Sequence, residues 1–239
     1  MSDTTIALVT GANKGIGHET VRQLRDLGTT VLLAARDHQR GTDAAKELDV
    51  DFVQLNVTDP DSAAAAAKLV DERYGRLDVL VNNAGITGGE PGLVRTADLA
   101  TVRTVFDTNY FGIIHVTQAM LPLLRRSKRP RIVNVSSGVG SLAAMSDPES
   151  PFAVIPGGLA YIPSKTAVNS LTVQYARELR DEGFLVNAAD PGYTATDLNN
   201  HSGFRTVQEG ATASVYLATL GPDGPTGGFF TDNGEVVAW

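Results

Sequence analysis

The chain has 239 residues, of which 42% are hydrophobic, and carries a formal net charge of −7 with a pI near 5.1. This length and composition predict one folded domain with a sizeable core, because no Pro/Ser-rich linker divides the sequence. The acidic balance argues against nucleic acid as a main partner. The absence of cysteine excludes disulfides and thiol catalysis, and the four histidines lack metal-ligand spacing, so no metal site is expected.

The N-terminal residues lead directly into an apolar run and lack the basic and apolar regions of a signal peptide. No apolar run is long enough to cross a bilayer. The sequence therefore predicts a cytoplasmic protein that has no membrane partner.

Short apolar runs alternate with amphipathic helical segments along the chain, the first of which covers residues 15–27. Apolar, β-branched runs between helices are typical of parallel strands that are buried on both faces. The pattern predicts an α/β fold, a single-domain Rossmann fold over residues 1–239, with a doubly wound parallel seven-stranded sheet and helices on both faces. The predicted strands are residues 6–9, 30–35, 51–55, 79–81, 131–135, 185–189 and 228–231.

Two polar stretches, residues 138–160 and 192–205, interrupt this alternation and are predicted to be loops. Loops beyond the carboxyl ends of parallel strands bind ligands in such folds, so we expect these two segments to form the walls of a substrate site. Their apolar side chains suggest an apolar or aromatic substrate, although packing of the loops against the body is an alternative role. These side chains are Phe152, Ile155, Tyr193 and Phe204.

Three glycines, Gly11, Gly15 and Gly17, follow the first predicted strand and open the first helix. Glycine lets the backbone turn tightly and approach a pyrophosphate, and the helix N-terminus presents N–H groups to the anion. Glycines also gather in ordinary turns, so the signal depends on this position between a strand and a helix. The segment is therefore interpreted as a dinucleotide-binding loop.

The end of the second strand bears on the choice of dinucleotide. We interpret it as Ala35 followed by Arg36, and a guanidinium can bind the 2′-phosphate of NADP by charge-assisted hydrogen bonds. Lys14 could reach the same phosphate. NADP(H) is therefore favoured over NAD(H), but an offset of one or two residues would make Asp37 a ribose-binding acid and favour NAD.

Tyr161 and Lys165 lie four residues apart, on one face of a predicted helix, with Pro163 acceptable in its first turn. A neighbouring ammonium stabilises a phenolate, so the pair predicts a tyrosine whose pKa is lowered for proton transfer at a carbonyl. Such a pair is common, and its meaning comes from the rest of the chain.

Taken together, these motifs resemble those of the short-chain dehydrogenase/reductase superfamily, and the chain is most similar to the NADPH-dependent carbonyl reductases of that superfamily. The resemblance covers almost the whole length. It is carried by residues 10–17, Asn82-Asn83-Ala84-Gly85, Asn109, Ser137, Tyr161 with Lys165, and Pro191-Gly192.

The resemblance implies that Tyr161 is the general acid in reduction and that Lys165 lowers its pKa and holds the nicotinamide ribose. It implies that Ser137 orients the substrate oxygen, with its neighbour Ser136 structural, and that Asn109 positions a water behind Lys165. The implied cofactor-binding residues are Gly11, Asn13, Lys14, Gly15, Ile16, Gly17, Arg36, Asn56, Val57, Asn82, Ala84, Gly85, Tyr161, Lys165, Pro191, Gly192, Thr194 and Thr196.

The chain departs from the family pattern at three places. The interval of 24 residues from Ser137 to Tyr161 is about twice the common one, and family members with such insertions include monomers, so the chain is either a monomer or a homo-oligomer (a dimer or tetramer). Asn56 replaces a common aspartate near the adenine, and Thr194 replaces a frequent valine.

The sequence thus predicts an NADPH-dependent oxidoreductase that reduces a ketone or aldehyde, with a small-molecule carbonyl/alcohol pair as its substrate. The alternatives are an NAD-dependent secondary-alcohol dehydrogenase of the same fold and a non-catalytic dinucleotide sensor.

Overall fold

The computed structural model describes residues 4–89 and 94–239; residues 1–3 and 90–93 of the predicted domain lie outside the described part. Seven parallel strands form one sheet in the order β3-β2-β1-β4-β5-β6-β7, which confirms the predicted fold. Every strand boundary lies within one residue of its predicted position. The strands are β1 (Ile6–Thr10), β2 (Thr30–Ala35), β3 (Asp51–Gln54), β4 (Val79–Asn82), β5 (Arg131–Val135), β6 (Leu185–Ala189) and β7 (Phe229–Phe230).

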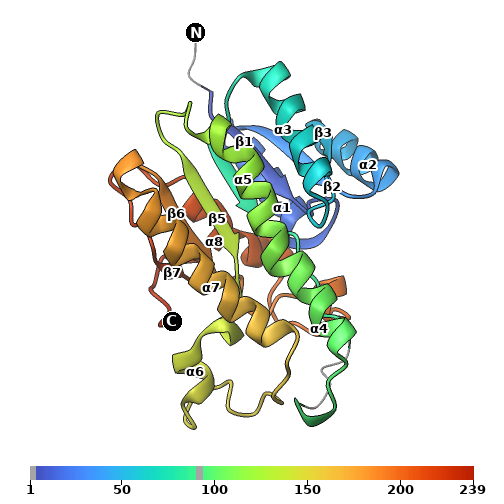
Figure 1. Ribbon diagram of the computed structural model, residues 1–239, viewed down its shortest axis with the longest axis vertical. Helices are drawn as coiled ribbons and strands as arrows, with labels where there is room; N and C mark the ends of the chain where they lie inside the picture. The colour runs from blue at the N-terminus through green and yellow to red at the C-terminus, as the bar shows by residue number, and fades with distance from the viewer. Residues whose placement is uncertain (1–3, 90–93) are drawn as a thin grey trace.

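Helices cover both faces of this sheet (Figure 1). One face packs against α1 (Gly15–Asp26), α2 (His38–Leu48) and α8 (Val207–Ala218). The other packs against α3 (Pro60–Tyr74), α5 (Gly112–Leu124) and α7 (Tyr161–Glu178). Among the described residues, no helix is both long enough and apolar enough to span a membrane.

Alternating residues of each strand supply the two cores. Val9, Leu33 and Val81 belong to the core under α1 and α8, whereas Leu8, Leu32 and Leu80 belong to the core under α3 and α5. Each of these six side chains is fully buried, and burying a Val or Leu side chain stabilises a fold by about 1.5–3 kcal/mol. Burial on both faces explains why the strands read as continuous apolar runs.

The strand order reverses between β1 and β4, because β2 and β3 lie on one side of β1 and all later strands lie on the other. Such a switch point leaves a crevice beyond the carboxyl ends of the two strands, where doubly wound folds bind ligands. The glycine-rich segment after β1 and the Asn-Asn-Ala-Gly segment after β4 both end at this crevice.

The two segments predicted to be loops are only partly irregular. The first contains the 3-10 turn η3 (Gly138–Gly140) and the short helix α6 (Leu142–Ser146), which forms because the Ser141 side chain caps it by accepting from the Ala144 N–H at 3.0 Å. The second contains the 3-10 turn η5 (Asp197–Asn199) and a parallel bridge between Thr194 and Arg205. The remaining turns are η1 (Val94–Thr96) and η4 (Arg180–Glu182).

A π-helical turn joins two helices before β5. Helix α4 (Leu99–Phe106) continues through the π-helix η2 (Asp107–Phe111) into α5 without a break. π-Helical turns are frequent at functional sites because they displace backbone groups from the regular α-helical ladder. Asn109 lies at the centre of this turn.

Candidate active site

The glycine loop makes close contact with the segment after β4. Gly11 has φ +63°, and a Cβ at this position would lie 2.8 Å from the Cα of Ala84. A Cβ on Gly17 would lie 2.3 Å from the side-chain nitrogen of Asn83. Both positions therefore require glycine, one for its backbone conformation and both for the close approach of the two segments.

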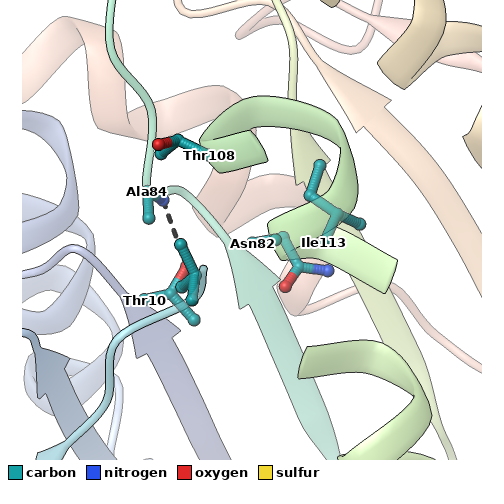
Figure 2. Close-up of a pocket in the computed structure, with 7 residues that line it drawn as sticks. Thr10, Asn82, Ala84, Thr108 and Ile113 are labelled. Atoms are coloured by element: carbon teal, nitrogen blue, oxygen red, sulfur yellow. Dashed lines mark hydrogen bonds between the residues drawn. The ribbon is translucent and has the colours of Figure 1, made fainter. Parts of the chain in front are cut away.

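Hydrogen bonds hold this approach in place, and we call them the Thr10–Asn83 clamp. The Thr10 hydroxyl accepts from the N–H groups of Asn83 at 3.0 Å and Ala84 at 3.1 Å. The Asn83 amide donates to the carbonyls of Thr10 at 2.9 Å and Gly11 at 3.2 Å. Figure 2 shows the Thr10–Ala84 bond beside a narrow hollow that is also lined by Val57, Asn82 and Gly112.

The first turn of α1 is open to an anion. Its N-cap residue Lys14 makes no side-chain capping bond, in contrast to α2, where the Asp37 carboxylate accepts from the Arg40 N–H at 2.9 Å. An uncapped helix start retains free N–H groups and a partial positive charge. Gly15 has φ +60°, and the space where its Cβ would lie contains only the Thr196 side chain, 3.6 Å away. These features suit the pyrophosphate of a dinucleotide.

The end of β2 has the predicted register. The strand ends at the buried Ala35, and Arg36 follows as an exposed cation. Asp37, the residue that would have supported NAD, uses its carboxylate to cap α2. An exposed cation therefore follows the carboxyl end of β2, and the acid next to it serves as the N-cap of α2.

Lys14 is paired differently from the prediction that it reaches the 2′-phosphate. Its ammonium lies 2.5 Å from the Asp197 carboxylate of η5, and His201 lies 2.9 Å from the other oxygen of that carboxylate. Lys14, Asp197 and His201 thus join the glycine loop to the segment after β6. Both partners of the lysine pair are more than half exposed, so solvent weakens the interaction.

Tyr161 begins α7, and Pro163 lies in the first turn of that helix as predicted. The Ser137 hydroxyl, just beyond β5, hydrogen-bonds to the Tyr161 phenol. Ser136 is buried, and its hydroxyl donates to the Asn169 side chain at 2.5 Å rather than to Tyr161. The structure therefore brings Ser137 and Tyr161 together across the 24-residue interval.

The prediction that Lys165 lowers the pKa of Tyr161 below its ordinary value is wrong, because the pKa of Tyr161 is raised in this structure. The pKa of Tyr161 is raised to about 12, chiefly by burial; the hydrogen bond from Ser137 opposes this rise, and the Asp190 carboxylate adds to it. Lys165 is 5% exposed, and burial lowers its own pKa to about 8. Its ammonium donates to the Val135 carbonyl at 2.7 Å and lies 5.6 Å from the centroid of the Tyr161 ring. Desolvation, which favours the neutral form of each group, outweighs their mutual attraction.

Asn109 lies behind this pair and is 1% exposed. Its side chain accepts from the Ile86 N–H at 2.8 Å and donates to the Ile86 carbonyl and the Ser164 hydroxyl, each at 2.9 Å. Gly85 lies between Asn109 and Lys165, because a Cβ there would be 3.4 Å from the Asn109 carbonyl oxygen and 3.7 Å from the Lys165 ammonium. Asn109 therefore fixes the segment after β4 against α7.

Two of the predicted cofactor residues use their side chains within the protein. Asn82 donates to Thr117 at 3.2 Å and to Asn134 at 2.9 Å, beneath α5, while it also lines the hollow in Figure 2. Asn56 accepts from the N–H of Thr58 at 3.3 Å and from its hydroxyl at 3.0 Å. Their backbones remain at the crevice, so any contact that they make with a cofactor is limited to the main chain or requires a change of side-chain partner.

The segment after β6 is held by its own hydrogen bonds. Gly192 has φ +67°, the Thr194 hydroxyl donates to the Pro191 carbonyl at 3.0 Å, and Thr196 caps η5. Tyr193 and Phe204 pack edge to face with 6.0 Å between ring centroids, and they are 49% and 84% exposed.

From the other predicted wall, Phe152 reaches the backbone beside Ser137. Its ring lies 2.7 Å from where a Cβ of Gly138 would stand, and Ile155 is half-buried nearby in the chain. The two walls thus present aromatic rings beside the Ser137 loop and beyond β6.

Sequence reasoning missed the role of Thr10, of the Asn83 side chain and of Asp190. The Asp190 carboxylate accepts from the N–H groups of Gly138 and Gly192, each at 3.0 Å. The sequence signal that could have identified Asp190 is an acidic residue placed between a buried strand and a Pro-Gly pair. Thr10 and Asn83 lie within recognised motifs, but their mutual contact depends on the β1–β4 pairing.

A doubly wound sheet with a glycine loop at its switch point and a Ser-Tyr-Lys set beside it is the arrangement of dinucleotide-binding oxidoreductases. The profile of the family described as short chain dehydrogenase matches residues 5–204, and the chain belongs to this family.

Similar proteins include carbonyl reductase [NADPH] 1 of Rattus norvegicus, 34% identical over 100% of this chain and 99% of the relative. A (+)-neomenthol dehydrogenase of Capsicum annuum is 32% identical, with 96% of each chain covered. The crystal structure of NADPH-bound carbonyl reductase from chicken fatty liver superposes with a TM-score of 0.86 at 31% identity, over 99% of each chain.

Proposed function

We propose that this chain reduces a ketone or aldehyde to an alcohol with NADPH as the hydride donor and Tyr161 as the general acid. The observation that carries the proposal is the contact of Tyr161 with both Ser137 and Lys165, although Ser137 and Tyr161 come from different elements. Asn109 supports these residues, because it donates to Ser164 on α7 and lies next to Gly85, which in turn lies next to Lys165.

The chemistry of the phenol suits proton donation. NADPH, when bound, supplies the hydride that reaches the carbonyl carbon, and negative charge then develops on the substrate oxygen. An alkoxide is a strong base, comparable with hydroxide, whose conjugate acid has a pKa well above that of a phenol. A phenol whose pKa is about 12 is therefore still acidic enough to protonate it, and at neutral pH it is fully protonated. The Ser137 hydroxyl is placed to hold the same oxygen by a hydrogen bond.

The residues at the crevice fit NADPH. The uncapped first turn of α1 and the positive-φ glycines 11 and 15 offer backbone N–H groups to the pyrophosphate. Arg36 is exposed at the end of β2 and offers a guanidinium to the 2′-phosphate. Lys165, once its bond to Val135 is exchanged, would hold the nicotinamide ribose hydroxyls.

An NAD-dependent alcohol dehydrogenase is the weaker candidate, because the acid needed for the adenosine ribose, Asp37, is occupied as the cap of α2. The names of the similar rat and chicken proteins, which specify NADPH, support the same preference. A non-catalytic sensor would have no need for the combination of Ser137, Tyr161 and Lys165.

We propose an apolar, ring-containing carbonyl compound as the substrate class. Tyr193, Phe204 and Val154 are exposed on the two walls, and Phe152 lies beside the Ser137 loop. The similarity to a neomenthol dehydrogenase, whose name indicates a cyclic alcohol, supports this class.

The test is a panel of cyclic ketones, aromatic aldehydes, quinones and short aliphatic ketones, each assayed with NADPH and with NADH by cofactor oxidation. We expect turnover with NADPH, greatest for the ring-containing carbonyls. Turnover with NADH alone would favour the dehydrogenase alternative. NADPH binding without turnover of any compound would favour the sensor.

A further inference from the structure

Asp190 joins the two segments that flank the proposed reacting centre. It follows β6 and precedes Pro191-Gly192, and one of its carboxylate oxygens accepts from both the Gly138 N–H and the Gly192 N–H at 3.0 Å. Gly138 is the residue after Ser137, and Gly192 opens the segment that contains Thr194 and Thr196. A single oxygen therefore fixes the Ser137 hydroxyl relative to the segment after β6.

The second oxygen of Asp190 makes a different set of contacts. It lies 3.0 Å from the position of a Cβ on Gly138, beside the ring of Phe152, and so faces the wall of the proposed substrate site. Burial is the largest cause of the raised pKa of Tyr161, and the charge of the Asp190 carboxylate acts on the phenol in the same direction. Such a charge disfavours the phenolate and retains the proton on the donor.

Other charges around Asp190 and Tyr161 come from three elements. Arg205 and Asp232, which pair with each other, face Asp190 from the segment after β6 and from the residues after β7. Burial raises the pKa of Asp190 and is the largest cause, whereas the N–H groups of Gly192 and Gly138 lower it and so stabilise the charged carboxylate. Of the two neighbouring charges, Arg205 lowers the pKa of Asp190 and Asp232 raises it. On α7, Lys165 faces the Tyr161 ring, but its hydrogen bond goes to Val135. Among the carboxylates of residues 4–89 and 94–239, Asp190 is thus the one whose charge acts on the phenol.

We propose that Asp190 is a positioning residue for carbonyl reduction, which ties the Ser137 loop to Gly192 and whose negative charge keeps the Tyr161 phenol in its proton-donating form. The inference rests on the proposed function and adds a bias toward reduction. A tyrosine that remains protonated at higher pH is a competent acid over a wider range, whereas the reverse reaction needs the phenolate as its base.

The test is Asp190→Asn, which retains an acceptor for both N–H groups and removes the charge. With NADPH and a ketone, the rate falls as pH rises through the pKa of the catalytic acid. We expect this falling limb to move to lower pH by about 0.5–1 unit, with the plateau rate below it within about threefold of the original. With NADP⁺ and the alcohol, the rising limb should move in the same direction.

Tyrosinate absorbance gives a readout that is independent of turnover. The difference between each protein and its Tyr161→Phe counterpart reports the ionisation of residue 161, and its onset should come at lower pH in Asp190→Asn. Asp223→Asn is the matched control, because Asp223 is an exposed carboxylate in the turn after α8 and the substitution changes the net charge equally. Neither limb should move in this control.

Each outcome decides one claim. An active protein whose Asp190→Asn variant loses rate but keeps both limbs and the absorbance onset in place would overturn the electrostatic role, since only a structural tie would remain. A chain that turns over no carbonyl compound would overturn the proposed function, while the absorbance onset would still test the effect of Asp190. If melting curves show that the asparagine variant does not fold, Asp190→Ser supplies a second neutral acceptor for the same measurements.

Discussion

The Lys165 ammonium lies 5.6 Å from the centroid of the Tyr161 ring, yet its hydrogen bond goes to the Val135 carbonyl at 2.7 Å. The two groups share one helix face but do not form a phenolate–ammonium pair in this structure. Burial lowers the pKa of Lys165 to about 8 and raises that of Tyr161 to about 12, so each group is driven toward its neutral form. Burial of the Lys165 ammonium therefore destabilises the native state, and this destabilisation depends measurably on pH.

We expect the free energy of unfolding to rise as pH increases from about 8 toward 10.5. In this window the unfolded chain keeps a proton on Lys165, whose ordinary pKa is 10.5, while the native protein has lost it, so higher pH favours the native state. The gain is on the order of 2–3 kcal/mol and should be absent in Lys165→Met.

Urea unfolding of both proteins between pH 7 and 10 measures this difference. Tyr74, Tyr161 and Tyr175 all have a pKa raised to about 12, so their contribution falls with pH above about 10 and is common to both proteins. Parallel stability curves for the two proteins would show that the native lysine keeps its proton.

Tyr161→Phe should lower turnover by at least ~10²–10⁴-fold, the usual contribution of a general acid. NADPH binding, measured by fluorescence titration, should stay within about threefold, because the ring and its packing remain. Tyr175→Phe is the matched control, since Tyr175 lies on the same helix, is also partly buried and has a similarly raised pKa. Substantial activity of Tyr161→Phe would remove the phenol from the mechanism.

Local pattern was sufficient for the strands and for the motifs, because burial on both faces leaves an unbroken apolar run at each strand. The helix α6 was missed because Pro and Gly dominate its surroundings and the Ser141 cap is a single residue.

Properties that depend on distant contacts were not predictable. The pKa of Tyr161 depends on desolvation and on Asp190, 29 positions away in the sequence, rather than on spacing to Lys165. Lys14 and Asp197 are separated by 183 positions, and their contact depends on how the segment after β6 folds beside the glycine loop. The role of Asp37 was open because a helix cap and a ribose ligand have the same sequence signature at the end of a strand.

Arg36→Asp should raise the Michaelis constant for NADPH by about 10–100-fold and that for NADH far less. Charge-assisted hydrogen bonds contribute about 1.5–3 kcal/mol, and the reversed charge also repels the 2′-phosphate. Lys46→Asp makes the same change in charge on α2 at the end farther from Arg36, and should leave the NADPH/NADH ratio unchanged. Equal effects of Arg36→Asp on both cofactors would remove Arg36 from the 2′-phosphate site.

Asp197→Asn should tighten NADPH binding by about two- to fivefold. The substitution releases Lys14 for the phosphates and removes a negative charge from the same edge of the crevice, but an exposed pair contributes at most about 1 kcal/mol. The gain should shrink at high salt, because screening weakens both effects. Glu182→Gln breaks a comparable exposed pair with Arg125, remote from the crevice, and should not alter the dissociation constant. Weaker NADPH binding by Asp197→Asn would mean that the Lys14–Asp197 pair supports the bound state.

Asn83→Ala should destabilise the protein by about 1–3 kcal/mol and weaken NADPH binding at the same time. The variant loses both amide donations of the Thr10–Asn83 clamp and leaves the partly buried carbonyls of Thr10 and Gly11 without this partner. Because the same bonds hold Gly11 against Ala84, the glycine loop should relax in the native state as well.

Thermal unfolding and NADPH titration of Asn83→Ala separate these two effects. Asn233→Ala, a truncation of an exposed asparagine after β7, is the control and should change neither quantity appreciably. A loss of stability with an unchanged dissociation constant would mean that the backbone of the glycine loop keeps its shape without the clamp. In that case the close contact of Gly17 with the Asn83 side chain would serve the packing of α1 against the sheet, and the glycine spacing would follow from the fold rather than from the cofactor.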